Sequence, residues 1–222
     1  MLTTRREIVF MVLAGIFITS AIVAELISCK LTTIGLYPII AGIVPWPIVF
    51  LLTDILNDEY GKKAVRRLSW ITTGLIGFCF LMVGVAIWLP ATPNSPVSDD
   101  EFIKVFGNSL FVMAGSITAF IISQLIDIRL FEFFKKRTGD KKIWLRSTGS
   151  TVISQCVDSF VVLGIGFYLP GLIDLETYFF LGFTGYATKL ALAILLTPVI
   201  YLVRALFKRV ILKGEVNSEG RF

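Results

Sequence analysis

The feature that most constrains this sequence is a series of six apolar segments, each close to the length that crosses a membrane. A transmembrane helix needs about 20 predominantly apolar residues. The segments cover residues 8–27, 38–53, 69–89, 106–134, 147–169 and 178–203. Only 17% of the 222 residues are charged and 55% are hydrophobic, whereas soluble domains have about 25% charged residues. We therefore expect a single all-α integral membrane domain with six transmembrane helices.

The second segment is the least regular of the six, because Pro38, Pro45 and Pro47 interrupt its first half. Proline lacks a backbone donor and clashes with the preceding helical turn. We expect a kinked or broken helix here. Such a helix is tolerated in a membrane where neighbouring helices or a cavity satisfy the freed backbone groups, as in transporters.

Basic residues orient the predicted helices. They gather before the first segment, after the second, between the fourth and fifth, and after the sixth, whereas residues 99–101, Asp174 and Glu176 make the opposite side acidic. The positive-inside rule then places both termini in the cytoplasm. The membrane that we expect the chain to cross is the cell inner (plasma) membrane. The polar tail, residues 213–222, is expected to be cytoplasmic.

Polar residues inside the fifth segment are the strongest candidates for a functional site. If Arg146 marks a membrane surface, Asp158 lies about 18 Å further along the helix, near the middle of a hydrocarbon layer about 30 Å thick. Ser154 shares the helical face of Asp158, and Gln155 lies beside them. A carboxylate at this depth is costly and needs a partner, a proton or water.

The motif S-Q-x-x-D occurs twice, at residues 123–127 and 154–158. The fourth segment runs inward and the fifth outward, so antiparallel pairing would bring the amide of each copy level with the carboxylate of the other. The first copy contributes Gln124 and Asp127, and Asp54, which directly follows the second segment, lies at a similar depth of about 12 Å. These groups could bond one another and hold the helices together, but three buried carboxylates favour a substrate site. The two copies of this motif leave open whether the chain contains an internal repeat.

Glu25 and Lys189 form a second candidate pair, in the outer half of the membrane. We interpret them either as an ion pair that opens and closes as a gate, or as two side chains that reach the headgroups. Trp46 and Phe160 are the aromatic residues that we expect to stack on a flat ligand.

Other residue types narrow the chemistry. The chain has no histidine, so any proton-driven step would use a carboxylate, for which Asp127 is the candidate. Cys29, Cys79 and Cys156 lack metal-ligand spacing, and we expect no disulfide, metal or cofactor. No phosphate-binding loop is present, which argues against an ATP-dependent enzyme. The lack of histidine and of clustered cysteine also disfavours a lipid-modifying enzyme.

Three stretches resemble the queuosine precursor transporters, also called the vitamin uptake transporter family: TDILNDEYG at residues 53–61, SQLID at 123–127, and WLRSTGSTVISQCVDSF at 144–160. The resemblance covers most of the chain. It implies import of 7-deazaguanine bases, such as 7-cyano-7-deazaguanine and its aminomethyl relative, for tRNA modification. The family's motif positions carry over to Asp54, Glu59, Gly61, Gln124, Asp127, Arg146, Ser150, Gln155 and Asp158. Residues 57–59, Asn-Asp-Glu, are more acidic than the usual family pattern, which leaves the exact substrate open.

On this resemblance we expect alternating access around a buried polar site. Asp158, or Asp54 as second choice, would accept the N–H/NH2 edge of the base, and the two glutamines would contact its other polar atoms. Glu59 and Arg146 are expected to have gating or structural roles. The alternatives are a substrate-binding subunit of an energy-coupling-factor transporter and a structural subunit. A homodimer is compatible with so small a transporter, and no nucleic-acid partner is expected.

Overall fold

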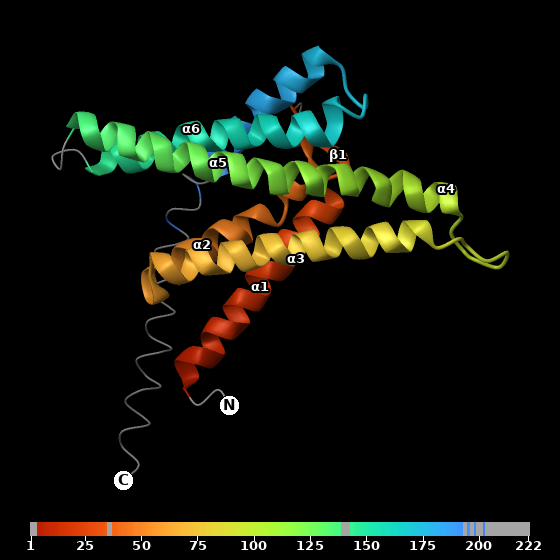
Figure 1. Ribbon diagram of the computed structural model, residues 1–222, viewed down its shortest axis with the longest axis horizontal. Coiled ribbons are helices and arrows are strands. Elements are labelled where there is room, and N and C mark those ends of the chain that lie inside the picture. Colours follow the sequence, from red (N-terminus) through yellow and green to blue (C-terminus); the bar gives the residue numbers. More distant parts are fainter. Residues whose placement is uncertain are drawn as a thin grey trace, which may run out of the picture.

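The computed structural model describes residues 4–34, 37–138 and 143–192, together with residues 195, 198 and 202. Most of these residues are helical (Figure 1). The longer helices are α1 (Arg5–Ile27), α2 (Trp46–Tyr60), α3 (Lys62–Trp88), α5 (Asn108–Thr138) and α6 (Ile143–Leu163). The shorter elements are the strands β1 (Leu31–Ile34) and β2 (Tyr37–Ile40) and the α-helix α4 (Asp99–Phe102). They also include the 3-10 helix η1 (Ala41–Ile43) and the π-helical turns η2 (Ile103–Gly107) and η4 (Gly164–Tyr168). Residues 175–192 form a further helix, while the predicted tail, residues 213–222, lies outside the described part of the chain.

Helix α1 begins with a capping box. The hydroxyl of Thr4 accepts a hydrogen bond from the backbone N–H of Glu7 (3.3 Å), and the Glu7 carboxylate accepts one from the backbone N–H of Thr4 (3.2 Å). This exchange satisfies two donors that the first turn would otherwise leave unpaired. At the opposite side of the molecule, the N–H of Thr177 donates to Asp174 Oδ1 (3.0 Å) at the start of helix 175–192. Hydrogen bonds from Thr177 hold the pKa of Asp174 below its ordinary value.

The predicted boundary of the second segment is wrong, because the chain is not helical at Pro38. Strands β1 and β2 pair antiparallel as a hairpin, with Thr33 opposite Pro38, and η1 follows β2 directly. Helix α2 starts only at Trp46, where Pro45 caps it and Pro47 occupies its first turn. Proline is tolerated there because first-turn N–H groups have no partner within the helix. The expected interruption is therefore a hairpin and a short turn that precede a complete helix.

Gly61 alone separates α2 from α3. Its backbone has φ 82° and ψ 162°, a region that only glycine occupies without strain. Because α2 ends here and α3 begins at the next residue, the chain reverses direction with no intervening loop (Figure 1).

Helices α5 and α6 lie side by side and are the most closely packed pair in the fold (Figure 1). Small residues permit the close approach where α5 crosses the end of α6 and η4. A Cβ added to Gly115 would lie 3.0 Å from the carbonyl oxygen of Val162, and one added to Gly166 would lie 3.2 Å from Val112 Cα. This stripe of small residues is how membrane helices bring their backbones together.

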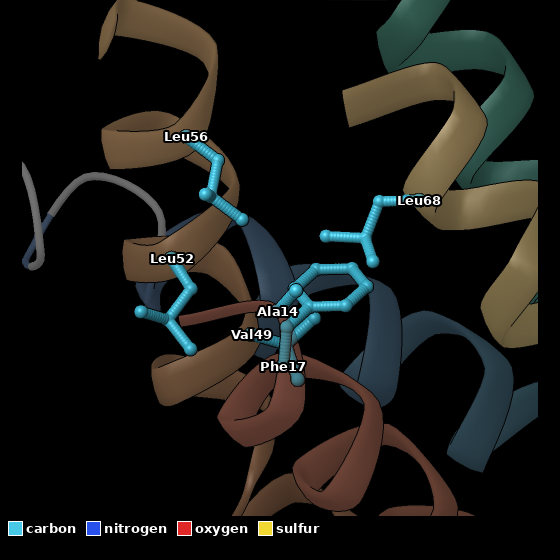
Figure 2. Packing of buried hydrophobic residues seen from close by; sticks show 6 residues of the cluster. All are labelled: Ala14, Phe17, Val49, Leu52, Leu56 and Leu68. Carbon is cyan, nitrogen blue, oxygen red and sulfur yellow. The ribbon is translucent and has the colours of Figure 1, made fainter. Parts of the chain in front are cut away.

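A core cluster joins the first three long helices. Phe17 and Ala14 of α1 pack against Leu52 and Leu56 of α2 and against Leu68 of α3 (Figure 2). Leu56 is completely buried. The cluster fixes the angle between α1 and the α2–α3 pair, and so positions the cavity described below.

Within the part of the chain that the structure describes, three helices are long and apolar enough to cross a membrane: Arg5–Ile27, Lys63–Trp88 and Asp99–Ser123. Two shorter apolar helices, Ala41–Asn57 and Val152–Tyr168, accompany them. Large apolar side chains of α3, such as Phe78 and Leu81, are more than half exposed, as expected of a surface that faces lipid. The all-α membrane class is thus confirmed, apart from one short hairpin, and the count of six spans stays a prediction.

Candidate functional site

A cavity of about 350 Å³ lies between α1, α2, α3, α5, α6 and helix 175–192. Its wall is mainly apolar, with polar side chains contributed by all six helices. The volume and the mixed lining are typical of a small-molecule binding site. The ionisable residues among the described lining residues are Glu25, Asp158 and Lys189.

Asp158 and Lys189 form an ion pair across the cavity wall. Lys189 Nζ lies 3.1 Å from Asp158 Oδ2 and also donates to Ser159 Oγ at 3.2 Å. The two charged side chains are only about one fifth exposed (Lys189 20%, Asp158 21%). The sequence placed Asp158 at membrane depth in need of a partner, and Lys189 is that partner in the structure.

Glu25 is the most buried charged residue of the site, with 6% of its surface exposed. Its Oε2 accepts a hydrogen bond from Ser116 Oγ at 2.6 Å, which links α1 to α5. The expected ion pair between Glu25 and Lys189 is therefore replaced by two separate contacts, because the lysine binds Asp158 instead. Both carboxylates nevertheless line the same cavity.

Trp46 and Gln155 also line the cavity. Trp46 is the first residue of α2, and its ring centroid lies 5.9 Å from Lys189 Nζ, within range of a cation–π contact. Gln155 is half-buried and lies one helical turn before Asp158 and Ser159 on α6. The tryptophan thus offers a flat ring beside the ion pair, and the glutamine offers an amide.

Other predicted site residues lie away from this cavity. Phe160 packs among the rings of Tyr178, Phe179 and Phe183, with centroids 5.7, 6.2 and 5.2 Å away, and it is not a lining residue. Its side chain fills the space beside Gly182, where a Cβ would collide with the ring. Phe160 therefore holds α6 against helix 175–192.

Ser154 and Asp54 do not line the cavity either. Ser154 is buried, with 3% of its surface exposed, and Asp54 is exposed on the outside of α2. The neighbour of Asp54, Thr53, is the residue whose side chain faces inward. Consecutive residues of a helix point about 100° apart, so a correct depth does not decide which of them faces the cavity.

Glu59 lies at the end of α2, where its backbone carbonyl accepts a hydrogen bond from Arg6 Nη2 at 2.6 Å. Its role here is to hold the start of α1 against the end of α2. The side chains of Gln124, Asp127 and Arg146 lie outside the described part of the structure, although their backbones belong to α5 and α6.

Sequence reasoning missed the hydroxyl groups of the cavity. Ser69, Thr72 and Thr73 of α3 all line it, and their spacing of three and four residues marks one helical face. On α5, Ser116 and Ser123 recur seven residues apart and both line the cavity. This periodicity could have identified them, but a serine or threonine at membrane depth is also common at helix contacts.

The apolar helices are those of an integral membrane protein, and the cavity between them is the candidate site. The chain matches the family model described as "Putative vitamin uptake transporter" over residues 40–203. It belongs to this family, whose members are transporters and not enzymes.

Two relatives extend the match. A "Probable queuosine precursor transporter" of Bacillus subtilis (strain 168) is 30% identical over 162 residues, which cover 72% of this chain and 69% of the relative. A protein of the same description from Haemophilus influenzae is 26% identical over 204 residues, covering 86% of this chain and 83% of the relative. A "Trans-enoyl reductase xenG" of Xenoacremonium sinensis matches 29% of this chain and only 19% of its own length, too little to indicate a shared function. No solved structure matches the chain.

Proposed function

We propose that this protein imports 7-deazaguanine queuosine precursors, 7-cyano-7-deazaguanine or its aminomethyl relative, across the inner membrane by alternating access. The description of the two relatives supports the substrate class. The observation that carries the proposal is that Asp158, Gln155 and Trp46 line the same cavity. A carboxylate, an amide and an aromatic ring are the groups that recognise a flat heterocycle with an N–H/NH2 edge.

The hydroxyl groups of the cavity favour a ligand that donates hydrogen bonds. Thr53, Thr72 and Thr73 each donate their hydroxyl hydrogen to the carbonyl four residues earlier, at 2.7, 2.8 and 3.0 Å. Their oxygen lone pairs remain as acceptors. Together with Asp158, they make the cavity rich in acceptors, which suits a guanine-like edge carrying several N–H groups.

Asp158 acts in this proposal as the acceptor of the N–H/NH2 edge. The Lys189 ammonium orients its carboxylate through the 3.1 Å contact, and Ser159 accepts a second hydrogen bond from that ammonium. Gln124 and Asp127 are proposed to complete the site, because they follow the cavity-lining residues Phe120 and Ser123 by four positions on α5. Asp54 is exposed and is the weaker candidate.

The placement of the helix ends supports an orientation with both termini in the cytoplasm. The α2–α3 junction, the end of α5 and the start of α6 lie at one side of the molecule (Figure 1), and these ends carry the basic clusters. Arg6 joins the start of α1 to the same junction through Glu59. The acidic α4 lies at the opposite side (Figure 1). A homodimer is compatible with this arrangement and is part of the proposal.

Uptake of 7-cyano-7-deazaguanine by the purified protein in lipid vesicles tests the proposal, with Asp158→Asn and the exposed control Asp100→Asn measured in parallel. We expect saturable uptake by the natural protein and by the control, and loss of uptake in Asp158→Asn. Normal uptake by Asp158→Asn would remove this residue from the site. Binding without uptake would instead favour a substrate-binding subunit that needs energy-coupling partners, and an absence of both would exclude the proposed substrate.

A further inference from the structure

The charges of the cavity do not balance. Asp158 and Lys189 neutralise each other at 3.1 Å, and the lysine directs its remaining contacts to Ser159 and the ring of Trp46. Among the described residues, Glu25 accepts a hydrogen bond from the hydroxyl of Ser116, which carries no charge. With all three groups ionised, the described lining of the cavity has a net charge of −1.

An uncompensated carboxylate is costly at this place. Glu25 is 6% exposed, and moving an ionised carboxylate into a low-dielectric interior costs several kcal/mol unless a positive charge accompanies it. A hydroxyl donor recovers part of this cost but leaves the charge in place. The described part of the site therefore lacks one positive charge, and the smallest and most mobile one is a proton.

No other described residue facing Glu25 can take this role. Helices α2, α3 and α5 and the turn η1 pack against α1, and among the described residues they bring hydroxyl groups, rings and apolar side chains to the cavity but no acid or base. The charged groups that act on Glu25 are Asp158 of α6 and Lys189 of helix 175–192, with opposite signs. These two already form a pair, so an arriving proton binds at Glu25.

We propose that Glu25 is the proton-coupling residue, and that import of the neutral base 7-cyano-7-deazaguanine is driven by protons moving through this carboxyl. A proton binds the Glu25 carboxylate from the outside when the cavity is loaded, which makes the site electrically neutral before it reorients. Release of the proton to the cytoplasmic side restores the ionised carboxylate, which the site stabilises through Ser116 until the next cycle. This inference rests on the proposed substrate, and it replaces Asp127 as the expected proton carrier.

The first test uses the natural protein. Vesicles containing it are loaded with a pH-sensitive dye and given external 7-cyano-7-deazaguanine under an inward proton gradient. We expect the base to accumulate above its external concentration and to carry protons inward, and both effects to vanish when an ionophore collapses the gradient. Saturable uptake that is indifferent to the gradient would overturn proton coupling while leaving the proposed substrate intact. Absence of any uptake or exchange would overturn the proposed substrate as well.

The second test assigns the residue. Glu25→Gln keeps the size and hydrogen-bonding ability of the side chain but cannot exchange a proton, and Glu176→Gln, at an exposed glutamate, is the matched control. We expect Glu25→Gln to exchange internal for external base at a rate within a few-fold of the natural protein, yet to lose accumulation under the gradient. Glu176→Gln should retain both activities. Gradient-driven accumulation by Glu25→Gln would overturn the assignment.

A second variant, Glu25→Asp, tests the assignment even where Glu25→Gln does not fold. It keeps a carboxyl group and should therefore retain part of the accumulation. If Glu25→Asp exchanges base without accumulating it, the assignment is overturned.

Discussion

Lys189 Nζ and Asp158 Oδ2 lie 3.1 Å apart although 31 residues separate them in the sequence. This contact joins α6 to helix 175–192 at the cavity wall, and it leaves Glu25 as the one carboxylate in the described lining without a cationic partner at contact distance. This pairing is the reason for the different roles that we propose for Asp158 and Glu25. In the proposed mechanism, Asp158 accepts the hydrogen bonds of the ligand and Glu25 takes up the proton.

The pairing predicts how charge removal affects stability. Lys189→Gln leaves Asp158 without a counter-charge in a largely buried place, and we expect it to destabilise the protein by about 3 kcal/mol. The double variant Asp158→Asn/Lys189→Gln removes both charges and should be less destabilised than Lys189→Gln alone. Thermal unfolding of the detergent-purified variants measures this difference. A double variant that is as destabilised as Lys189→Gln, or more so, would contradict this prediction.

The contact between η1 and α1 predicts that position 42 accepts no side chain larger than that of glycine. A Cβ added there would collide with Ser28 Oγ and would lie 2.7 Å from the backbone carbonyl oxygen of Ala24. The serine can rotate, but the carbonyl belongs to α1 and cannot move independently. We expect Gly42→Ala to destabilise the protein by about 1–3 kcal/mol.

Gly74→Ala is the matched control for this variant, because nothing lies within 4 Å of a Cβ added to Gly74 in α3. Alanine favours a helix by up to about 1 kcal/mol over glycine, so the control should be neutral or stabilising. A melting temperature of Gly42→Ala equal to that of Gly74→Ala would contradict the contact between η1 and α1.

The α2–α3 junction predicts a second position where alanine is harmful, for a different reason. Nothing lies within 4 Å of a Cβ added to Gly61, yet its φ of 82° with ψ of 162° is a conformation that side chains rarely adopt. We expect Gly61→Ala to cost about 1–3 kcal/mol through backbone strain. Gly15→Ala, also open but inside α1, serves as control in the same thermal unfolding measurement, and equal stability of both variants would exclude strain.

Much of the helical architecture could be predicted from apolar segment length, because a membrane helix must satisfy its backbone internally. The described helices overlap all six expected segments. The hairpin was not predicted. Its sequence, with Pro38 between apolar residues, has the same hydropathy as a membrane helix, and only the pairing of β1 with β2 distinguishes the two.

The candidate site was only partly predictable. Depth along a helix follows from counting residues, and this brought attention to Asp158, Gln155, Glu25 and Lys189, all of which line the cavity. Which partner each charge chooses depends on how helices far apart in sequence are rotated against each other. That rotation is set by contacts such as Gly115 against Val162, which a single sequence does not reveal.

The two aromatic residues expected to stack on the ligand are predicted to behave differently. Trp46 lines the cavity, so Trp46→Leu should remove a stacking surface worth about 1–3 kcal/mol per base and raise the KM for uptake at least about 5-fold, while Trp46→Phe should retain most of the affinity. Phe160 lies in the ring cluster with Tyr178 and Phe183, so Phe160→Leu should lower the melting temperature and leave KM within about 2-fold of the natural value. Concentration-dependent uptake in vesicles and thermal unfolding of the same preparations separate these effects. A raised KM in Phe160→Leu with normal stability would place this ring at the ligand, because loss of packing alone changes the amount of folded protein and not its affinity for the base.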